Sequence, residues 1–100
     1  MEAKREGRAI TQLSRLAAEF FARELAIHGI LTVSRVALAS EGRRATIFVT
    51  IFPDAAVAEG LHEARRLRRP LQEYIQEKVK AVRAPYLDVL IDNQTKRPDR

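Results

Sequence analysis

At residues 65–70 the chain reads RRLRRP, so four arginines lead directly into a proline between two helical patterns. Extending the apolar stripe of the first pattern seven residues beyond Leu61 would place Arg68 in the core, where an unpaired guanidinium is costly. Pro70 indicates the same interruption, because inside a helix it removes a backbone hydrogen bond and clashes with the preceding turn. The sequence therefore predicts two consecutive helices with a kink between them.

The length and the lack of cysteine limit the class of protein. A chain of 100 residues forms one domain with one core, and without cysteine it holds neither a disulfide nor a thiolate metal site. This composition suits a reducing, cytoplasmic compartment. Its apolar runs are shorter than the roughly 18 residues of a membrane span, and its first residues carry charges where a signal peptide is apolar. We expect one domain over residues 8–93, with flexible charged tails over residues 1–7 and 94–100.

The chain is basic, and its positive charge is unevenly distributed. Eighteen Lys and Arg against 13 Asp and Glu give a net charge of +5. The excess is concentrated in residues 65–69 and near the C-terminal end of the sequence. Such a balance is typical of nucleic-acid-binding proteins, although a charged surface also serves solubility.

The first half of the chain predicts a helix followed by a β-hairpin. Apolar residues recur at helical spacing over residues 10–27, and Gly29 is placed to end that helix. Residues 30–38 and 45–52 read as two strands joined by a short turn. The alternation of the first strand changes parity near Ser34, which indicates a β-bulge.

The second half predicts two helices and a last strand. Asp54, a preferred N-cap residue, starts a helix that extends to about Leu67. Pro70 is favoured at a first helical position and starts another, which extends to about Val82. Residues 86–92 alternate as a strand. The order α-β-β-α-α-β, with a helical crossover before the last strand, predicts an α+β domain with helices packed on one face of a three-stranded mixed sheet.

The aromatic residues do not indicate a surface for reading bases. Phe48 and Phe52 share one face of a strand, and we expect both to be covered. Tyr74 and Tyr86 are expected to pack, with their hydroxyls at the rim. Recognition of shape and phosphate is therefore favoured over recognition of base sequence.

Four segments, in their order and spacing, carry a family resemblance. They are TVSRVAL at 32–38, ATIFVTIF at 45–52, AVAEGL at 56–61 and PYLDVLIDN at 85–93. Over about residues 8–94 the chain resembles the ribosome-binding factor A (RbfA) family, whose fold is a type II KH-like domain. Two features differ from the family pattern. LRR at 67–69, followed by Pro70, stands where members usually have Ala-x-Gly, and the loop at 27–31 is shorter and lacks an Asp-Pro pair.

The resemblance implies a ribosome assembly factor. Members of the family bind the free small (30S) ribosomal subunit and assist late processing and maturation of its 16S rRNA by non-catalytic RNA binding. The expected partners are therefore the small subunit and its rRNA, with no membrane and no small-molecule substrate. We expect a monomer.

The arginines of the kink are the main candidates for contact with RNA. Guanidinium groups bind phosphate in a bidentate manner, and the first-turn N–H groups of Leu71, Gln72 and Glu73 would add donors for an anion. The alternative is a solvated face paired with glutamates at 59, 63 and 73. The kink candidates are Arg65, Arg66, Arg68 and Arg69, and the secondary candidates are Lys4, Arg5, Arg8, Arg43, Arg44, Lys80 and Arg83.

Catalysis has little support in the sequence. His28 and His62 are the only histidines, no carboxylate cluster accompanies either, and the glycines are isolated. We expect no enzyme activity, no cofactor and no metal. The alternative function is a protein-interaction module that uses a sheet edge or a helix face without contacting RNA. A double-stranded DNA binder is a third option, but no recognition-helix motif is present.

Overall fold

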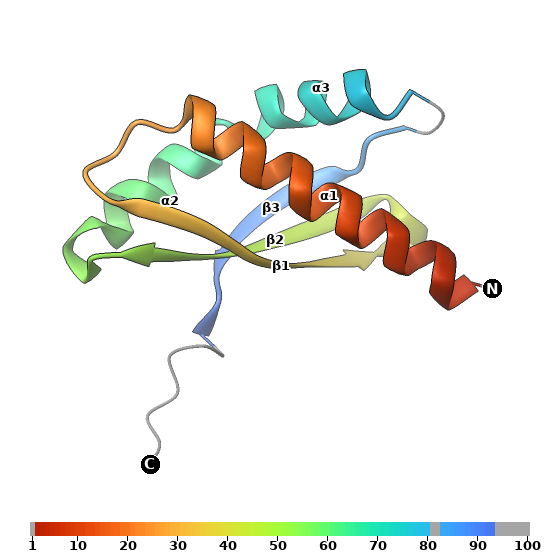
Figure 1. Ribbon diagram of the computed structural model, residues 1–100, viewed down its shortest axis with the longest axis horizontal. Helices are drawn as coiled ribbons and strands as arrows, with labels where there is room; N and C mark the ends of the chain where they lie inside the picture. Colours follow the sequence, from red (N-terminus) through yellow and green to blue (C-terminus); the bar gives the residue numbers. More distant parts are fainter. Residues whose placement is uncertain (1, 81–82, 94–100) are drawn as a thin grey trace, which may run out of the picture.

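The computed structural model describes residues 2–80 and 83–93, which form a three-stranded sheet with helices on one face (Figure 1). The predicted order α-β-β-α-α-β and the α+β class are confirmed. The helices and strands are α1 (Glu2–Glu24), β1 (Ile30–Ala39), β2 (Arg44–Phe52), α2 (Val57–Arg66), α3 (Arg68–Lys78) and β3 (Tyr86–Ile91). None of the helices over the described residues combines the length and apolarity that crossing a membrane requires.

The sheet is mixed, with β2 in its centre. β1 pairs with β2 antiparallel and β3 pairs with β2 parallel, as the crossover through two helices predicts. The register between β1 and β2 shifts between Val33 and Arg35, so the predicted bulge is confirmed. The bulge lets Val33 and Val36 both face the helices although they are an odd number of residues apart.

The turn of the hairpin has Gly42 at positive φ, as predicted, and two further residues at positive φ that were not predicted. Gly42 has a φ of +85°, as its place in the turn predicts. Ser40 and Glu41 also have positive φ values, of 55° and 56°. The turn therefore bends through three successive left-handed residues, two of which carry side chains.

The core lies between the helices and the apolar face of β2. Ala45, Ile47, Val49 and Ile51 alternate along β2 and are all buried, as their period of two predicts. The buried residues of the helices that cover them are Leu13, Leu16, Ala17, Phe20, Phe21, Gly60, Ala64, Leu71 and Ile75. Among the described residues, no helix covers the opposite face of the sheet (Figure 1), and we call it the open face.

Two boundaries of α1 differ from the prediction. The helix ends at Glu24 and not at residue 27, and Gly29 lies five residues beyond its end, so the role of Gly29 as a helix stop is wrong. The helix begins at Glu2, so residues 2–7, which we expected to form a tail, are helical. The other expected tail, residues 94–100, lies outside the described residues. The limits of the domain remain a prediction.

The helices after the hairpin also start and end elsewhere. Asp54 is not the N-cap of α2: it opens a 3-10 turn over Asp54–Ala56, and α2 begins at Val57. α3 ends at Lys78 because Val79 leaves the helical region, with φ −120° and ψ 85°. The prediction that this helix continues to Val82, a residue outside the described part of the chain, was too long.

Two glutamines on α3 explain how the chain turns back into β3. Gln72 Nε2 donates to Pro85 O at 2.9 Å, and Ala84 N–H donates to Gln76 Oε1 at 2.7 Å. The two side chains are one helical turn apart and satisfy backbone groups of the connecting segment. They fix the start of β3 against α3.

A buried carboxylate ties the bulge of β1 to the end of β3. Asp92 is 2% exposed, and its Oδ2 accepts a hydrogen bond from Ser34 Oγ at 2.5 Å. Arg35 Nε lies 3.4 Å from the same oxygen, at ion-pair distance but without hydrogen-bond geometry. Asp92 N–H donates to Val49 O at 2.8 Å, which extends the ladder between β2 and β3. Residues 58 positions apart are thus joined across the central strand.

Replacing Asp92 with Ala should lower the free energy of unfolding by about 2 to 3 kcal/mol, because Ser34 loses a hydrogen-bond acceptor and Arg35 loses its ion-pair partner. Urea denaturation followed by circular dichroism measures the change. Asp88→Ala is the matched control, since Asp88 is exposed and forms one long surface ion pair. Equal losses in the two variants would contradict the role given to Asp92.

Replacing Gly29 with Ala should destabilise the fold by about 1 to 3 kcal/mol, through overpacking. A Cβ at this position would lie 2.6 Å from Phe52 O and 2.8 Å from Ala56 Cβ. Gly7→Ala is the control, because a Cβ there meets nothing within 4 Å and alanine favours the helix by roughly 1 kcal/mol. Thermal unfolding should shift in opposite directions, and a shift in the same direction would contradict this packing.

Candidate nucleic-acid interface

The predicted kink is present, and it lies at Leu67. α2 ends at Arg66, Leu67 has φ −92° and ψ 9°, and α3 begins at Arg68. Arg68 is exposed, so the chain avoids the buried guanidinium that a straight helix would have required. Pro70 is the third residue of α3, within the first turn, where its lack of an N–H is tolerated.

The early start of α3 corrects the hypothesis of free backbone donors. Leu71 N–H donates to Leu67 O at 2.9 Å. Gln72 and Glu73 lie beyond the first four residues of the helix, where N–H groups have partners in the preceding turn. The prediction that these three N–H groups are available to an anion is therefore wrong.

The four arginines of this region, which we call the kink arginines, are all exposed but have different surroundings. Arg65 Nε donates to Val89 O at 3.1 Å. Arg66 pairs with Glu63 at 3.4 Å, and Arg68 pairs with Asp88 at 3.7 Å. Within residues 2–80 and 83–93, no carboxylate lies at ion-pair distance from Arg69.

These contacts divide the kink arginines into two kinds. Arg65 satisfies a carbonyl on the outer edge of β3, so it holds the kink against the sheet. The other three present their charges to solvent, and surface pairs such as Arg66–Glu63 are weak enough to exchange for a phosphate. Of the three glutamates expected as partners, Glu63 alone pairs with a kink arginine in the described part of the chain, and Glu59 contacts His28 at 3.6 Å instead.

Several secondary candidates gather at the hairpin end of the molecule. Arg43 and Arg83 line a groove of about 960 Å³ whose apolar floor includes Leu13 and Ile75. Two more secondary candidates are neighbours in sequence of residues that line this groove, and both are exposed. Arg8 precedes the lining residue Ala9, and Lys80 follows the lining residue Val79. Arg44 is exposed at the start of β2. The side chains of Lys4 and Arg5 lie outside the described part of the structure.

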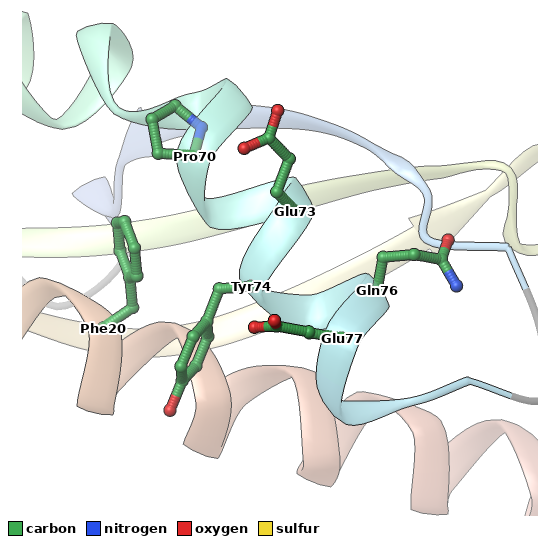
Figure 2. A pocket seen from close by; sticks show the side chains of 6 residues that line it. All are labelled: Phe20, Pro70, Glu73, Tyr74, Gln76 and Glu77. Carbon is green, nitrogen blue, oxygen red and sulfur yellow. The ribbon is translucent and has the colours of Figure 1, made fainter.

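A second groove, between α1 and α3, is lined by two glutamates. Figure 2 shows Tyr74 lying along α1 beside Phe20, with Glu73 and Glu77 on the same stretch of α3. The rings of Phe20 and Tyr74 are 5.5 Å apart, and the guanidinium of Arg23 lies 5.0 Å from the Tyr74 centroid. Its interaction with Tyr74, and then its hydrogen bond to Glu24, raise the pKa of Arg23 above its ordinary value. Lys78 Nζ lies 5.4 Å from the same centroid, so this side of α3 carries both signs of charge.

The open face of the sheet contains aromatic residues that we predicted from the sequence to be covered. Phe52 is 72% exposed and Tyr86 is 71% exposed, so both predictions of packing are wrong. Phe48 is covered, because the guanidinium of Arg35 stacks 3.7 Å from its ring centroid. Tyr74 packs as expected.

The histidines have no surroundings that would support catalysis. His28 is almost fully exposed beside Glu59, and His62 is exposed on α2. Over the residues that the structure describes, no three His, Asp or Glu side chains come together in a group suited to a metal ion.

Solved structures share this fold. The chain is similar to the crystal structure of ribosome-binding factor A from Thermus thermophilus, with a TM-score of 0.74, 24% identity, and coverage of 92% of this chain and 98% of that one. The fold is that of ribosome-binding factor A. The resemblance predicted from the sequence is thereby confirmed.

Two further structures agree with this comparison. A homology model of Thermus thermophilus ribosome-binding factor A, fitted into the cryo-EM map of a 30S complex, matches with a TM-score of 0.71, 26% identity, and coverage of 89% of this chain and 94% of that one. The solution NMR structure of a candidate ribosome-binding factor A from Thermotoga maritima matches with a TM-score of 0.72, 17% identity, and coverage of 94% and 92%. No protein-family model matches the chain, and no curated protein matches it either.

Within this ribosome-binding factor A fold, sequence reasoning missed the residues that position the kink and β3. The bond from Arg65 to Val89 joins residues 24 positions apart, and the bonds from Gln72 span 12 and 13 positions. An arginine and a glutamine on helix surfaces carry no local signal for such contacts. The one indication of these contacts in the sequence was the i, i+4 spacing of Gln72 and Gln76 on the helix that precedes Ala84-Pro85.

Replacing Arg65 with Met should lower the free energy of unfolding by about 1 kcal/mol, because Val89 O loses its donor. Arg69→Met, with the same change of charge and size, should stay within about 0.5 kcal/mol of the original protein. Urea denaturation measures both. Equal effects would show that Arg65 has no structural role distinct from that of Arg69.

Proposed function

We propose that the chain binds the free small (30S) ribosomal subunit and assists late processing and maturation of 16S rRNA by non-catalytic RNA binding. The observation that carries the proposal is the fold, which matches ribosome-binding factor A structures over about nine tenths of the chain. One of those structures is fitted into the map of a 30S complex. No step of bond making or breaking is assigned to the protein.

The charge distribution supports RNA as the component that is contacted. Arg66, Arg68 and Arg69 are exposed together at the kink, and a guanidinium binds phosphate through two parallel hydrogen bonds. The pair with Glu63 holds Arg66 in place but contributes little to stability, so little free energy is lost when a phosphate replaces the carboxylate. The cations at the hairpin end would extend the contact.

Sedimentation of a lysate through a sucrose gradient tests the proposal directly. The chain should travel with free small subunits at low salt and dissociate steeply as salt rises, because bound phosphates release counterions. Absence from the small-subunit fractions at low salt would overturn the proposal. Comparing precursor and mature 16S rRNA in cells with and without the protein tests the maturation step separately.

Reversing Arg69 to Glu should weaken small-subunit binding and reduce its salt slope by about one unit, because one phosphate contact is lost. Adding Arg68→Glu should weaken binding further. Arg15→Glu is the control: it changes the charge by the same amount on the exposed face of another helix, α1. If Arg69→Glu and Arg15→Glu behave alike, the kink does not contact RNA.

A protein-interaction module remains the second candidate, and one observation favours it. Four large apolar side chains are exposed on strands of the sheet, namely Ile30, Phe52, Tyr86 and Leu90. A complex formed through them would survive nuclease and would show a shallow salt dependence. The gradient experiment, repeated after nuclease treatment, separates the two functions.

A further inference from the structure

Tyr86 presents an aromatic ring at the start of β3, at the hairpin end of the open face. Its side chain is 71% exposed, and its partner across the parallel ladder is the exposed Arg44. Asp88 follows two residues later on the same face of the strand, where Arg68 of the kink reaches it at 3.7 Å. A ring, two guanidinium groups and a paired carboxylate are therefore next to one another.

The backbone under this ring is held on both sides. Tyr86 N–H donates to Arg43 O at 2.9 Å, which begins the pairing with β2. The preceding carbonyl, Pro85 O, accepts a hydrogen bond from Gln72 at 2.9 Å. An aromatic residue on a strand fixed in this way gives a rigid platform, so little conformational freedom is lost when a flat ligand stacks on it.

The groups around Tyr86 match the parts of a nucleotide. An exposed ring stacks on a base of any identity, while guanidinium groups on either side bind phosphate. The carboxylate of Asp88 accepts hydrogen bonds from exocyclic amino groups, and its charge is offset by Arg68. A base paired inside a helix has no free face for stacking, so the ligand is an unpaired nucleotide.

Charge favours RNA over an apolar peptide at this end of the sheet. Ile30 and Phe52 are register partners at the opposite end of the strands. The eight residue steps along β2 from Arg44 to Phe52 correspond to roughly 26 Å. Tyr86 is thus remote from the exposed pair Ile30–Phe52 and close to arginines, in a chain of net charge +5.

We infer that Tyr86, with Arg44 and the Arg68–Asp88 pair, forms a stacking site for one unpaired nucleotide of an RNA strand whose phosphates lie on the kink arginines. The inference rests on the proposed function for the identity of the RNA. It adds a base contact to an interface that the sequence had assigned to phosphate alone.

Tyrosine fluorescence tests the stacking directly, because the chain has no tryptophan and two tyrosines. Tyr74→Phe leaves Tyr86 as the sole emitter, and Tyr86→Phe leaves Tyr74, which packs against α1. Each variant is titrated with a single-stranded RNA of about ten nucleotides and with the same strand in a duplex. Single-stranded RNA should quench Tyr86 strongly and Tyr74 weakly, and the duplex should quench Tyr86 less.

Affinity for the same single strand gives an independent measure. Tyr86→Ala should weaken binding roughly 5- to 150-fold, the range for loss of one stacked base. Phe52→Ala removes an equally exposed ring at the far end of the sheet and should change affinity less than about twofold. Urea denaturation of both variants checks that they fold.

Each result has a defined meaning. Equal quenching of the two tyrosines, or unchanged affinity in Tyr86→Ala, overturns the stacking site even if the chain still sediments with small subunits. Binding of RNA that depends on Tyr86, without sedimentation with small subunits, supports the site and overturns the proposed function. A nuclease-resistant protein complex lost in Tyr86→Ala, with RNA affinity unchanged, shows that the occupant is a protein and overturns the inference.

Discussion

The change of direction at Leu67 is the constraint on which the helical layer depends. In a straight helix residue 70 would donate its N–H to Arg66 O, and a proline has no N–H to give. Leu67 lies at this break: its N–H donates to Glu63 O at 3.2 Å, and its carbonyl accepts from Leu71 N–H at 2.9 Å. The kink therefore falls where the missing donor costs least. It lets α2 pack on β2 and β3 while α3 packs on α1 and β3.

The same kink determines where the positive charge lies. Arg65 bonds to Val89 O and Arg68 pairs with Asp88, so the turn is attached to the edge strand at two successive residues. The basic segment therefore lies beside β3, near Tyr86 at the start of that strand. The kink arginines, which the sequence places on a helix surface, therefore lie along the edge of the sheet.

Strong local patterns predicted the fold well. Alternation along β2, the parity change near Ser34 and the kink before Pro70 each reflect a local geometric rule, and each agrees with the structure. The face of β2 that carries Phe52 was misjudged because alternation separates two faces without saying which one the helices cover. The end of α1 was misjudged because apolar spacing continues beyond Glu24, although the backbone does not remain helical.

The candidate site was less predictable than the fold. A run of arginines indicates a basic surface, but whether each side chain meets a carbonyl, a carboxylate or solvent depends on strands far away in the sequence. Arg65 and Arg69 are four residues apart and indistinguishable by composition, yet one bonds to β3 and the other projects into solvent. The interface therefore emerges only once the kink and β3 are placed together.

The open face of the sheet differs between its middle and its two ends. At its middle, Arg35 covers Phe48, and the carboxylate of Asp92 is buried beside it, so this region offers neither a free ring nor a free charge. Leu90 is exposed beside Phe48, and the other exposed groups lie at the ends: apolar side chains at Ile30 and Phe52, and Tyr86 among arginines at the other end. Apolar burial depends weakly on ionic strength, whereas phosphate binding depends on it strongly. The two ends therefore suit partners of different chemistry, and the end beside the kink is the one that we propose for RNA.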